Sequence, residues 1–451
     1  MSIVSFQKKF VHGLRWNSVE SILYYSILAA HQIGLRTISS STLYGAMGTL
    51  LALVYLTIVF FNWGLDFSIG PFFSIYISSK RLFRRYLLRQ LIAQGFIYSL
   101  IATGMIIILA AGYLPIKGMP QISWFLALII SLLIVTEGVK KSLRIILQFA
   151  FLSHMTAGIE LFYIISYVAT IWISYVLFGS ISLLNIFLPM LIISSVSTLF
   201  LVMALYKLYT IVPAGESGKT CSWKQIGYNR MSNYGYQVTR ELFTSNFLIP
   251  FFAMKFGLGL AALLELVTAF NQFITIIIKK VFGITGQTLL SHAKNMKLAY
   301  KRVAFEMASR NLYRVLMVVM ALILIGYKPL CDLKLTQSCT DSSLIGLLFF
   351  LLLFSENFIL LYEKWFIIEE KTPYLILFNG SLLALFWAIT KVAYTNSPYI
   401  LLSTLIVLRF IAYFSLVGIS FYKWQLKIPC PKKCCLAYVI LLVLGCFFLF
   451  G

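Results

Sequence analysis

Polar side chains recur on one face of the first long apolar segment, residues 12–34. They are Asn17, Glu20, Ser21, Tyr24 and His31. Residues three, four or seven positions apart share one side of an α-helix. A carboxylate at membrane depth is costly in hydrocarbon, and such groups usually face a bundle interior or a water-filled path. The stripe therefore predicts that Glu20, with Asn17 and Tyr24, lines a substrate path.

A second polar stripe lies on the apolar segment 232–254. Its members are Asn233, Gln237, Arg240 and Thr244. Glu20 and Arg240 each lie about eight residues into their segments, which at about 1.5 Å per residue puts them at matched depth. We expect these two side chains to face each other across a cavity and to form a gate. Opening that gate would release Arg240 to contact the substrate.

The stretch from Ala214 to Thr220 is similar to a phosphate-binding loop around its Gly218-Lys219 pair. That motif requires a glycine five residues before Gly218, and Pro213 stands there. The motif also follows a strand, whereas this stretch follows an apolar segment long enough to span a bilayer. We therefore expect a solvated linker and no ATPase activity.

The cysteines and histidines do not form a recognisable metal motif. Cys430, Cys434 and Cys435 lack a fourth ligand at a zinc spacing, and the histidines are scattered along the chain. Cys331 and Cys339 lie in one outer connection, where we predict a disulfide, with two free thiols as the alternative. We expect no metal site and no other cofactor.

The composition is that of a membrane protein. Of the 451 residues, 60% are hydrophobic and 11% are charged, and the mean hydropathy is +0.91. A soluble domain has about a quarter of its residues charged. The net charge of +23 is expected from lysine and arginine in the cytoplasmic connections between spans. The sequence has no soluble module on which basic residues alternate with exposed aromatic residues, so we do not expect nucleic-acid binding.

Because a span takes roughly 20 apolar residues, the chain is expected to be an all-α polytopic membrane protein of about 12–13 transmembrane helices. The spans are expected at 12–34, 42–63, 87–112, 121–138, 155–178, 181–206, 232–254, 258–283, 307–327, 342–362, 373–394, 397–422 and, shorter, 436–450. Lysine and arginine concentrate in every second connection between the expected spans, and Lys140 and Arg144 are among these residues. The positive-inside rule then places the N-terminus in the cytoplasm and Gly451 outside.

The longest polar break falls after six spans and precedes six more. It predicts an N-terminal six-helix lobe over 1–207, a cytoplasmic linker over 208–231 and a C-terminal six-helix lobe over 232–425. Residues 426–451 are expected to form a basic loop and a short additional helix. The connections are too short to hold a soluble catalytic domain, so an enzyme is not expected.

The N-terminal part of the chain also carries a family pattern. It comprises Ile33-Gly34-Leu35, Tyr44-Gly45, Gly64-Leu65-Asp66 with Pro71, the stretch 137–144, the helix start 156–160 and the stretch 279–283. This pattern resembles the polysaccharide-transporter branch of the multidrug/oligosaccharidyl-lipid/polysaccharide exporter superfamily, which includes O-antigen flippases and the peptidoglycan lipid II flippase. The resemblance covers residues 1–290, and beyond them it rests on helix count. One departure is the run from Ser39 to Thr42, where the family often has acidic residues.

The resemblance implies two lobes around a central cavity that opens alternately to each side of the bacterial inner membrane. It implies a lipid-linked oligosaccharide with an anionic pyrophosphate as substrate, as in O-antigen and lipopolysaccharide biosynthesis, and membrane lipid as the surrounding partner. Arg240 occupies a position where such flippases place cavity cations, with Gln237 and Thr244 beside it. Arg15 is the candidate cavity cation of the first lobe. Its position beside Trp16 also suits a side chain that snorkels to the lipid headgroups.

Two other classes stay open at this point. One is a small-molecule antiporter of the multidrug-extrusion type, in which buried carboxylates bind a cation and a proton. The other is a membrane-embedded enzyme that acts on polyprenyl-linked sugars. The sequence does not identify the coupling ion.

Overall fold

The structure is a computed structural model. It describes residues 3–62, 77, 79–113, 116, 118–150, 152–212, 214, 223–278, 302–303, 305–306, 309–310, 312–319, 321, 341–369, 371–392 and 397–424. Every regular element in these ranges is an α-helix, and eight of the described helices are long and apolar enough to cross a membrane. The chain is an all-helical multi-pass membrane protein, as its composition predicts. It divides into two compact units, Met1–Ala262 and Leu263–Gly451.

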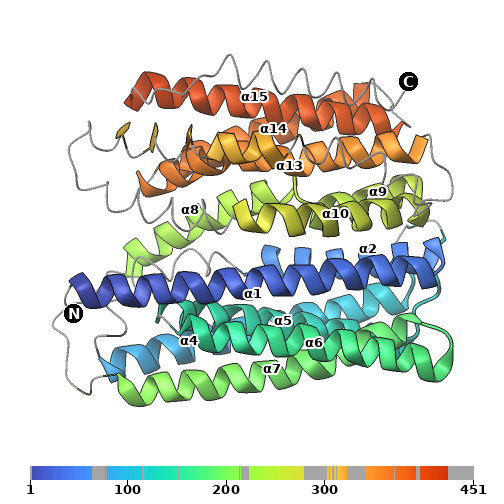
Figure 1. The fold of residues 1–451 in the computed structure, drawn as a ribbon, viewed down its shortest axis with the longest axis horizontal. Coiled ribbons are helices and arrows are strands. Elements are labelled where there is room, and N and C mark those ends of the chain that lie inside the picture. Colours follow the sequence, from blue (N-terminus) through green and yellow to red (C-terminus); the bar gives the residue numbers. More distant parts are fainter. Residues whose placement is uncertain are drawn as a thin grey trace. The chain divides into compact units, whose positions relative to one another are not determined.

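In the first unit, drawn in Figure 1, helix α5 (Trp124–Phe149) contacts four other helices. The helices of this unit are α1 (Ile3–Ile38), α2 (Ser41–Phe60), α4 (Lys80–Ala110), α5, α6 (Ser153–Phe178), α7 (Leu183–Ile211), α8 (Trp223–Glu241), α9 (Ser245–Phe256) and the start of α10 (Leu258–Ile278). Helix α5 packs on α4 and α7 and also contacts α2 and α6, while α1 packs on α6 and α9 packs on α2. Phe83, Leu143 and Leu201 are fully buried where α4, α5 and α7 meet.

Glycines let two pairs of helices approach closely in this unit. A Cβ atom on Gly138 of α5 would lie 2.6 Å from the ring of Tyr98 on α4, and one on Gly34 of α1 would lie 2.5 Å from Trp172 on α6. Real Cβ atoms do not approach other atoms so closely, so a side chain at either position would displace a ring. These two glycines set how closely α4 packs on α5 and α1 on α6.

The second unit has an aromatic interior. Its longer described helices are α13 (Asp341–Ile368), α14 (Thr372–Val392) and α15 (Pro398–Trp424), and α13 packs on both of the others. Phe305 lies 5.1 Å from Tyr362 and 5.6 Å from Trp365 between ring centroids. Trp365 in turn contacts Trp424 of α15 at 6.3 Å. Edge-to-face pairs of this kind stabilise a core beyond the area that they bury.

The expected single helix over 232–254 is wrong in one respect. The structure has two helices, α8 and α9, which are separated by a turn at 242–244. In that turn the amides of Phe243 and Thr244 donate to the carbonyls three residues earlier, and the Thr244 hydroxyl donates to the carbonyl of Glu241 at 2.8 Å. Short polar side chains compete for backbone partners in this way and interrupt helices.

Helix α5 is longer than its expected span. The sequence interpretation ends the span at 138, lets 139–154 extend the helix beyond the bilayer and counts Lys140 and Arg144 with an inside connection, and α5 continues to Phe149. Both cations therefore lie on a packed helix and not in a loop. Their side chains find carboxylates on the same and on neighbouring helices, which removes the need for water around them.

Several predictions fall outside the described residues. These are the disulfide of Cys331 and Cys339, the short helix 436–450, the basic cluster with Cys430, Cys434 and Cys435, the position of Gly451, and most of the loop that is similar to a phosphate-binding motif. The division into lobes at 208–231 stays a prediction. Helix α7 continues to Ile211 and α8 begins at Trp223, so the expected linker includes helical residues at both ends.

Candidate functional site

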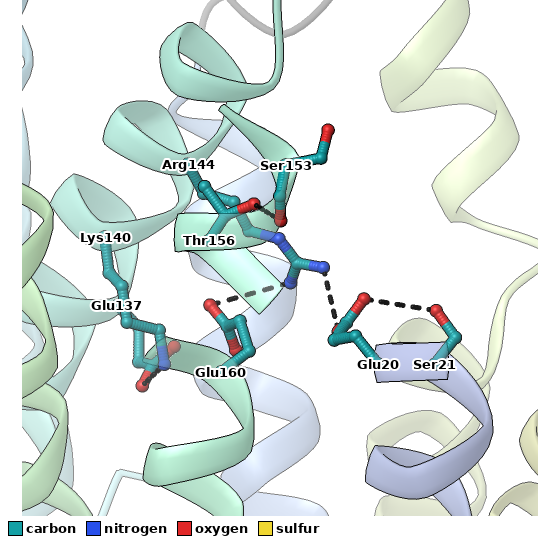
Figure 2. Close-up of polar contacts among 8 residues, drawn as sticks. All are labelled: Glu20, Ser21, Glu137, Lys140, Arg144, Ser153, Thr156 and Glu160. Carbon is teal, nitrogen blue, oxygen red and sulfur yellow. Dashed lines mark hydrogen bonds and ion pairs between the residues drawn. The ribbon is translucent and has the colours of Figure 1, made fainter. Parts of the chain in front are cut away.

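Arg144 of α5 lies between two buried carboxylates. Its Nη2 donates to Glu20 Oε1 of α1 at 3.2 Å, and its Nη1 lies 3.6 Å from Glu160 Oε1 of α6 (Figure 2). Glu20 and Glu160 are each 3% exposed. The hydroxyl of Ser21 donates to the second oxygen of Glu20 at 3.2 Å. One guanidinium thus joins three helices, and it is shared by two acids.

A second ion pair lies one to two turns earlier on α5. Lys140 Nζ donates to Glu137 Oε1 at 2.9 Å, and both side chains are buried. The same ammonium group lies 3.5 Å from the ring centroid of Tyr163 on α6. A cation over an aromatic face is stabilised by the ring, the more so when water is excluded. Lys140 is therefore held by one acid and one ring.

Tyrosines surround these ion pairs. Tyr24 of α1, Tyr55 of α2 and Tyr163 all lie within electrostatic range of Glu137. Tyr24, which the sequence predicts to line the path, is partly buried and contacts Tyr25 at 5.2 Å between ring centroids. Hydroxyl groups beside buried carboxylates offer hydrogen-bond partners that an aliphatic core lacks.

We call Glu20, Glu137, Lys140, Arg144 and Glu160 the N-terminal charge cluster. It holds three carboxylates and two cations, so one negative charge is left over when all five groups are ionised. Glu160 lies within α6, one of the helices long and apolar enough to span a membrane. Protonation of Glu20 or Glu160 would weaken the contact of that acid with Arg144.

The sequence predicts a gate between Glu20 and Arg240, and the structure gives Glu20 the partner Arg144. The contact with Arg240 stays a prediction. Arg240 lies in the last turn of α8, directly before the turn at 242–244, and is partly buried. The neighbouring carboxylate, Glu241, accepts from the side-chain amide of Asn246 at 2.7 Å.

The remaining predicted residues lie in different surroundings. Arg15 is exposed, while Gln237 of α8 is buried with 8% exposure. Thr244 forms the turn between α8 and α9. The backbone of Asn17 belongs to α1, and its side chain is outside the description.

Sequence reasoning missed the partner of Glu20. Glu137, Lys140 and Arg144 follow a spacing of three and then four residues, which puts them on one helix face. Two cations beside an acid are typical of a loop at the membrane surface, so this stripe alone did not indicate a buried site. Treating 124–149 as one packed helix would have identified this face as part of a buried site.

Metal ligands do not gather in the described ranges. No group of three or more His, Cys, Asp or Glu side chains there has an arrangement that could hold a metal ion. His31, from the first polar stripe, is buried against aromatic rings and lies 5.4 Å from Tyr167 and 6.4 Å from Trp172 between ring centroids. This histidine is part of the packing between α1 and α6.

Solved structures with a similar fold are transporters. A multidrug resistance MATE family transporter of the MOP superfamily in an inward-facing conformation aligns over 88% of this chain and 99% of its own, at TM-score 0.56 and 15% identity. An outward-facing structure of a multidrug resistance MATE family transporter aligns over 92% and 95%, at TM-score 0.55 and 12% identity. A MOP superfamily transporter from Pyrococcus furiosus, described as having a binding pocket of reverse polarity, aligns over 91% and 96%, at TM-score 0.51 and 14% identity.

No protein-family model and no curated protein matches the chain. The likeness to the three transporters shows the fold, and identities of 12–15% carry no more than that. This fold is the one that the superfamily resemblance of the sequence implies. The polysaccharide-transporter branch is not distinguished from the multidrug branch by these structures.

Proposed function

We propose that the chain is a membrane transporter that works by alternating access and moves a lipid-linked oligosaccharide across the bacterial inner membrane, with its N-terminus in the cytoplasm. The observation that supports a transporter best is the N-terminal charge cluster. Ionised groups at membrane depth, such as Glu160 in the candidate span α6, are costly, and where they occur they usually serve transport or proton relay. A scaffold would be more stable with well-packed apolar residues in their place.

The arrangement of Arg144 offers a way for ion binding to alter helix packing. Its guanidinium bonds Glu20 on α1 and Glu160 on α6 from a third helix. Neutralising either acid weakens its own ion pair with Arg144 and leaves the other ion pair intact. In this proposal, proton or cation uptake therefore shifts α1 relative to α6, and the shift accompanies the change between inward-open and outward-open states.

The proposal for an anionic cargo rests on Arg240 and on the sequence resemblance. Arg240 precedes the turn between α8 and α9, and broken helices mark substrate sites in many transporters. The N-terminus of α9, at Ser245, carries the positive end of a helix dipole. A guanidinium beside such a turn suits the pyrophosphate of a lipid-linked sugar.

A test is transport in proteoliposomes loaded with a fluorescent lipid-linked oligosaccharide. Arg240→Ala should reduce the initial rate at least tenfold while leaving expression and membrane insertion unchanged. Arg230→Ala is the matched control, because it removes the same charge from α8 at a residue that hydrogen-bonds Gln90 of α4 at 2.8 Å. Wild-type transport in Arg240→Ala would reject the substrate role of this arginine.

The second candidate is a multidrug-type antiporter of small molecules. It is favoured by the three carboxylates of the N-terminal charge cluster, which suit a cationic substrate or a coupling cation, and by the multidrug transporters that share the fold. Efflux of a cationic dye driven by an imposed pH gradient, with no movement of lipid-linked sugar, would establish this function in place of the flippase.

A further inference from the structure

The beginning of α4 is strongly basic. Its first ten residues hold Lys80, Arg81, Arg84, Arg85 and Arg89, and no acidic residue occurs anywhere in Lys80–Ala110. The four arginines are exposed, and Lys80 is partly exposed. We call these five residues the α4 basic stripe.

The opposite face of the same turns is fixed in the protein core. Phe83 is fully buried, and Tyr86 and Leu87 are 5% and 9% exposed. All three pack in the cluster formed with α5 and α7. Helix α4 therefore cannot rotate to bury its cations, and the arginines must point away from the first unit.

The exposed face of α4 changes from basic to apolar along the helix. Beyond Arg89 it continues through Ile92, Phe96 and Leu100, whose side chains are 65%, 69% and 67% exposed. Positions four residues apart follow one another on the same side of a helix. Large apolar side chains so exposed in a membrane-spanning helix face lipid tails. Since the cations precede them on the same face, the α4 basic stripe lies at the level of the lipid headgroups.

The stripe concentrates positive charge at one end of α4. The N-terminal end of a helix carries a partial positive charge, so cations in the first turns are destabilising. Lys80 and Arg84, Arg81 and Arg85, and Arg85 and Arg89 are like-charged pairs four residues apart, and such pairs repel. Helix α7 adds an exposed cation, Lys207, and Lys80 lies 4.9 Å from the ring centroid of Tyr209 on that helix.

We infer that the α4 basic stripe is a binding surface for the phosphate groups of anionic phospholipids in the adjoining leaflet. Arginine pairs with phosphate through two parallel hydrogen bonds. A phospholipid also supplies acyl chains for the apolar face that begins at Ile92, so one ligand satisfies both parts of the helix surface. A soluble acidic partner would contact only the charges. The inference is independent of what the protein transports.

The test uses the full chain in nanodiscs of zwitterionic phosphatidylcholine, with or without phosphatidylglycerol. Phosphatidylglycerol should raise the unfolding temperature of the wild type, and native mass spectrometry should detect retained anionic lipid. Arg81→Gln with Arg85→Gln should lower the apparent lipid affinity about thirtyfold, since each cation near a charged membrane surface contributes about 1 kcal/mol. Raising the salt concentration should weaken the wild-type effect.

The matched control is Arg310→Gln with Arg314→Gln, which removes two exposed arginines at the same spacing in the second unit. It should keep the response to phosphatidylglycerol. Inorganic phosphate added to zwitterionic nanodiscs should not reproduce the stabilisation, because it lacks the chains. An unchanged lipid response in the α4 double variant, an equal loss in the control, or full stabilisation by free phosphate would each overturn the assignment.

Discussion

The two compact units differ in what joins their helices. In the first unit, Arg144 and Lys140 of α5 join neighbouring helices through ion pairs and a ring contact. In the second unit, the described residues of α13 and α15 join through aromatic rings, with Trp365 against Trp424 and Tyr362 against Tyr413. Its interior also buries charged side chains, Glu363 and Arg409, each 3% exposed.

This difference separates a responsive part of the molecule from a stiff one. An ion pair changes its strength when a proton or cation binds, whereas an aromatic contact does not depend on pH or ions in this way. We therefore expect the first unit to rearrange during transport and the second to serve as a more constant support. The comparison predicts large, charge-dependent effects of substitution at the ion pairs of the first unit and small, additive ones at the aromatic contacts of the second.

The largest effect is expected from Arg144→Met. The substitution leaves Glu20 and Glu160 buried without the guanidinium that they share, and breaking a buried pair costs about 3–5 kcal/mol. The free energy of unfolding in mixed micelles measures the loss. A double variant, Arg144→Met with Glu160→Gln, should recover part of it, because it removes the repulsion between the acids. If the double variant is no more stable than the single one, the cluster is not held together by charge.

An intermediate effect is expected from Gly138→Ala. The new methyl group would lie 2.6 Å from the ring of Tyr98, so α4 and α5 must move apart, and overpacking of this kind costs about 1–3 kcal/mol. Glu137 and Lys140 lie on either side of Gly138, so their ion pair should be disturbed as well. The matched control is Gly104→Ala on α4, where a Cβ atom meets no other atom within 4 Å. Equal unfolding free energies for the two alanine variants would show that the close contact does not position the cluster.

Much of the fold follows from the sequence, because apolar length alone defines a membrane span. The expected ranges 42–63, 155–178 and 397–422 lie within a few residues of α2, α6 and α15. The break between α8 and α9 was not predicted. Its cause is the local competition of Thr244 and Asn246 for backbone and carboxylate partners, which hydropathy does not register.

The candidate site could be predicted only in part. Glu20 and Tyr24 were found because their spacing on one helix is visible in the sequence. The partner of Glu20 was not found, since Arg144 is 124 positions away along the chain and pairing across helices depends on tertiary packing. A single sequence gives the polar face of each helix but not which faces meet.

The smallest effect is expected from Tyr413→Phe in the second unit. The hydroxyl of Tyr413 lies 3.1 Å from that of Tyr313, and its ring contacts Phe358 and Tyr362 at 6.2 and 6.1 Å between centroids. Phenylalanine keeps the ring contacts and loses one neutral hydrogen bond, which costs about 0.5–1.5 kcal/mol. The change should leave the pH dependence of transport as in the wild type, whereas Glu160→Gln in the first unit should shift it. A shifted pH profile in Tyr413→Phe would mean that the aromatic interior also takes part in ion coupling, and the contrast between the two units would fail.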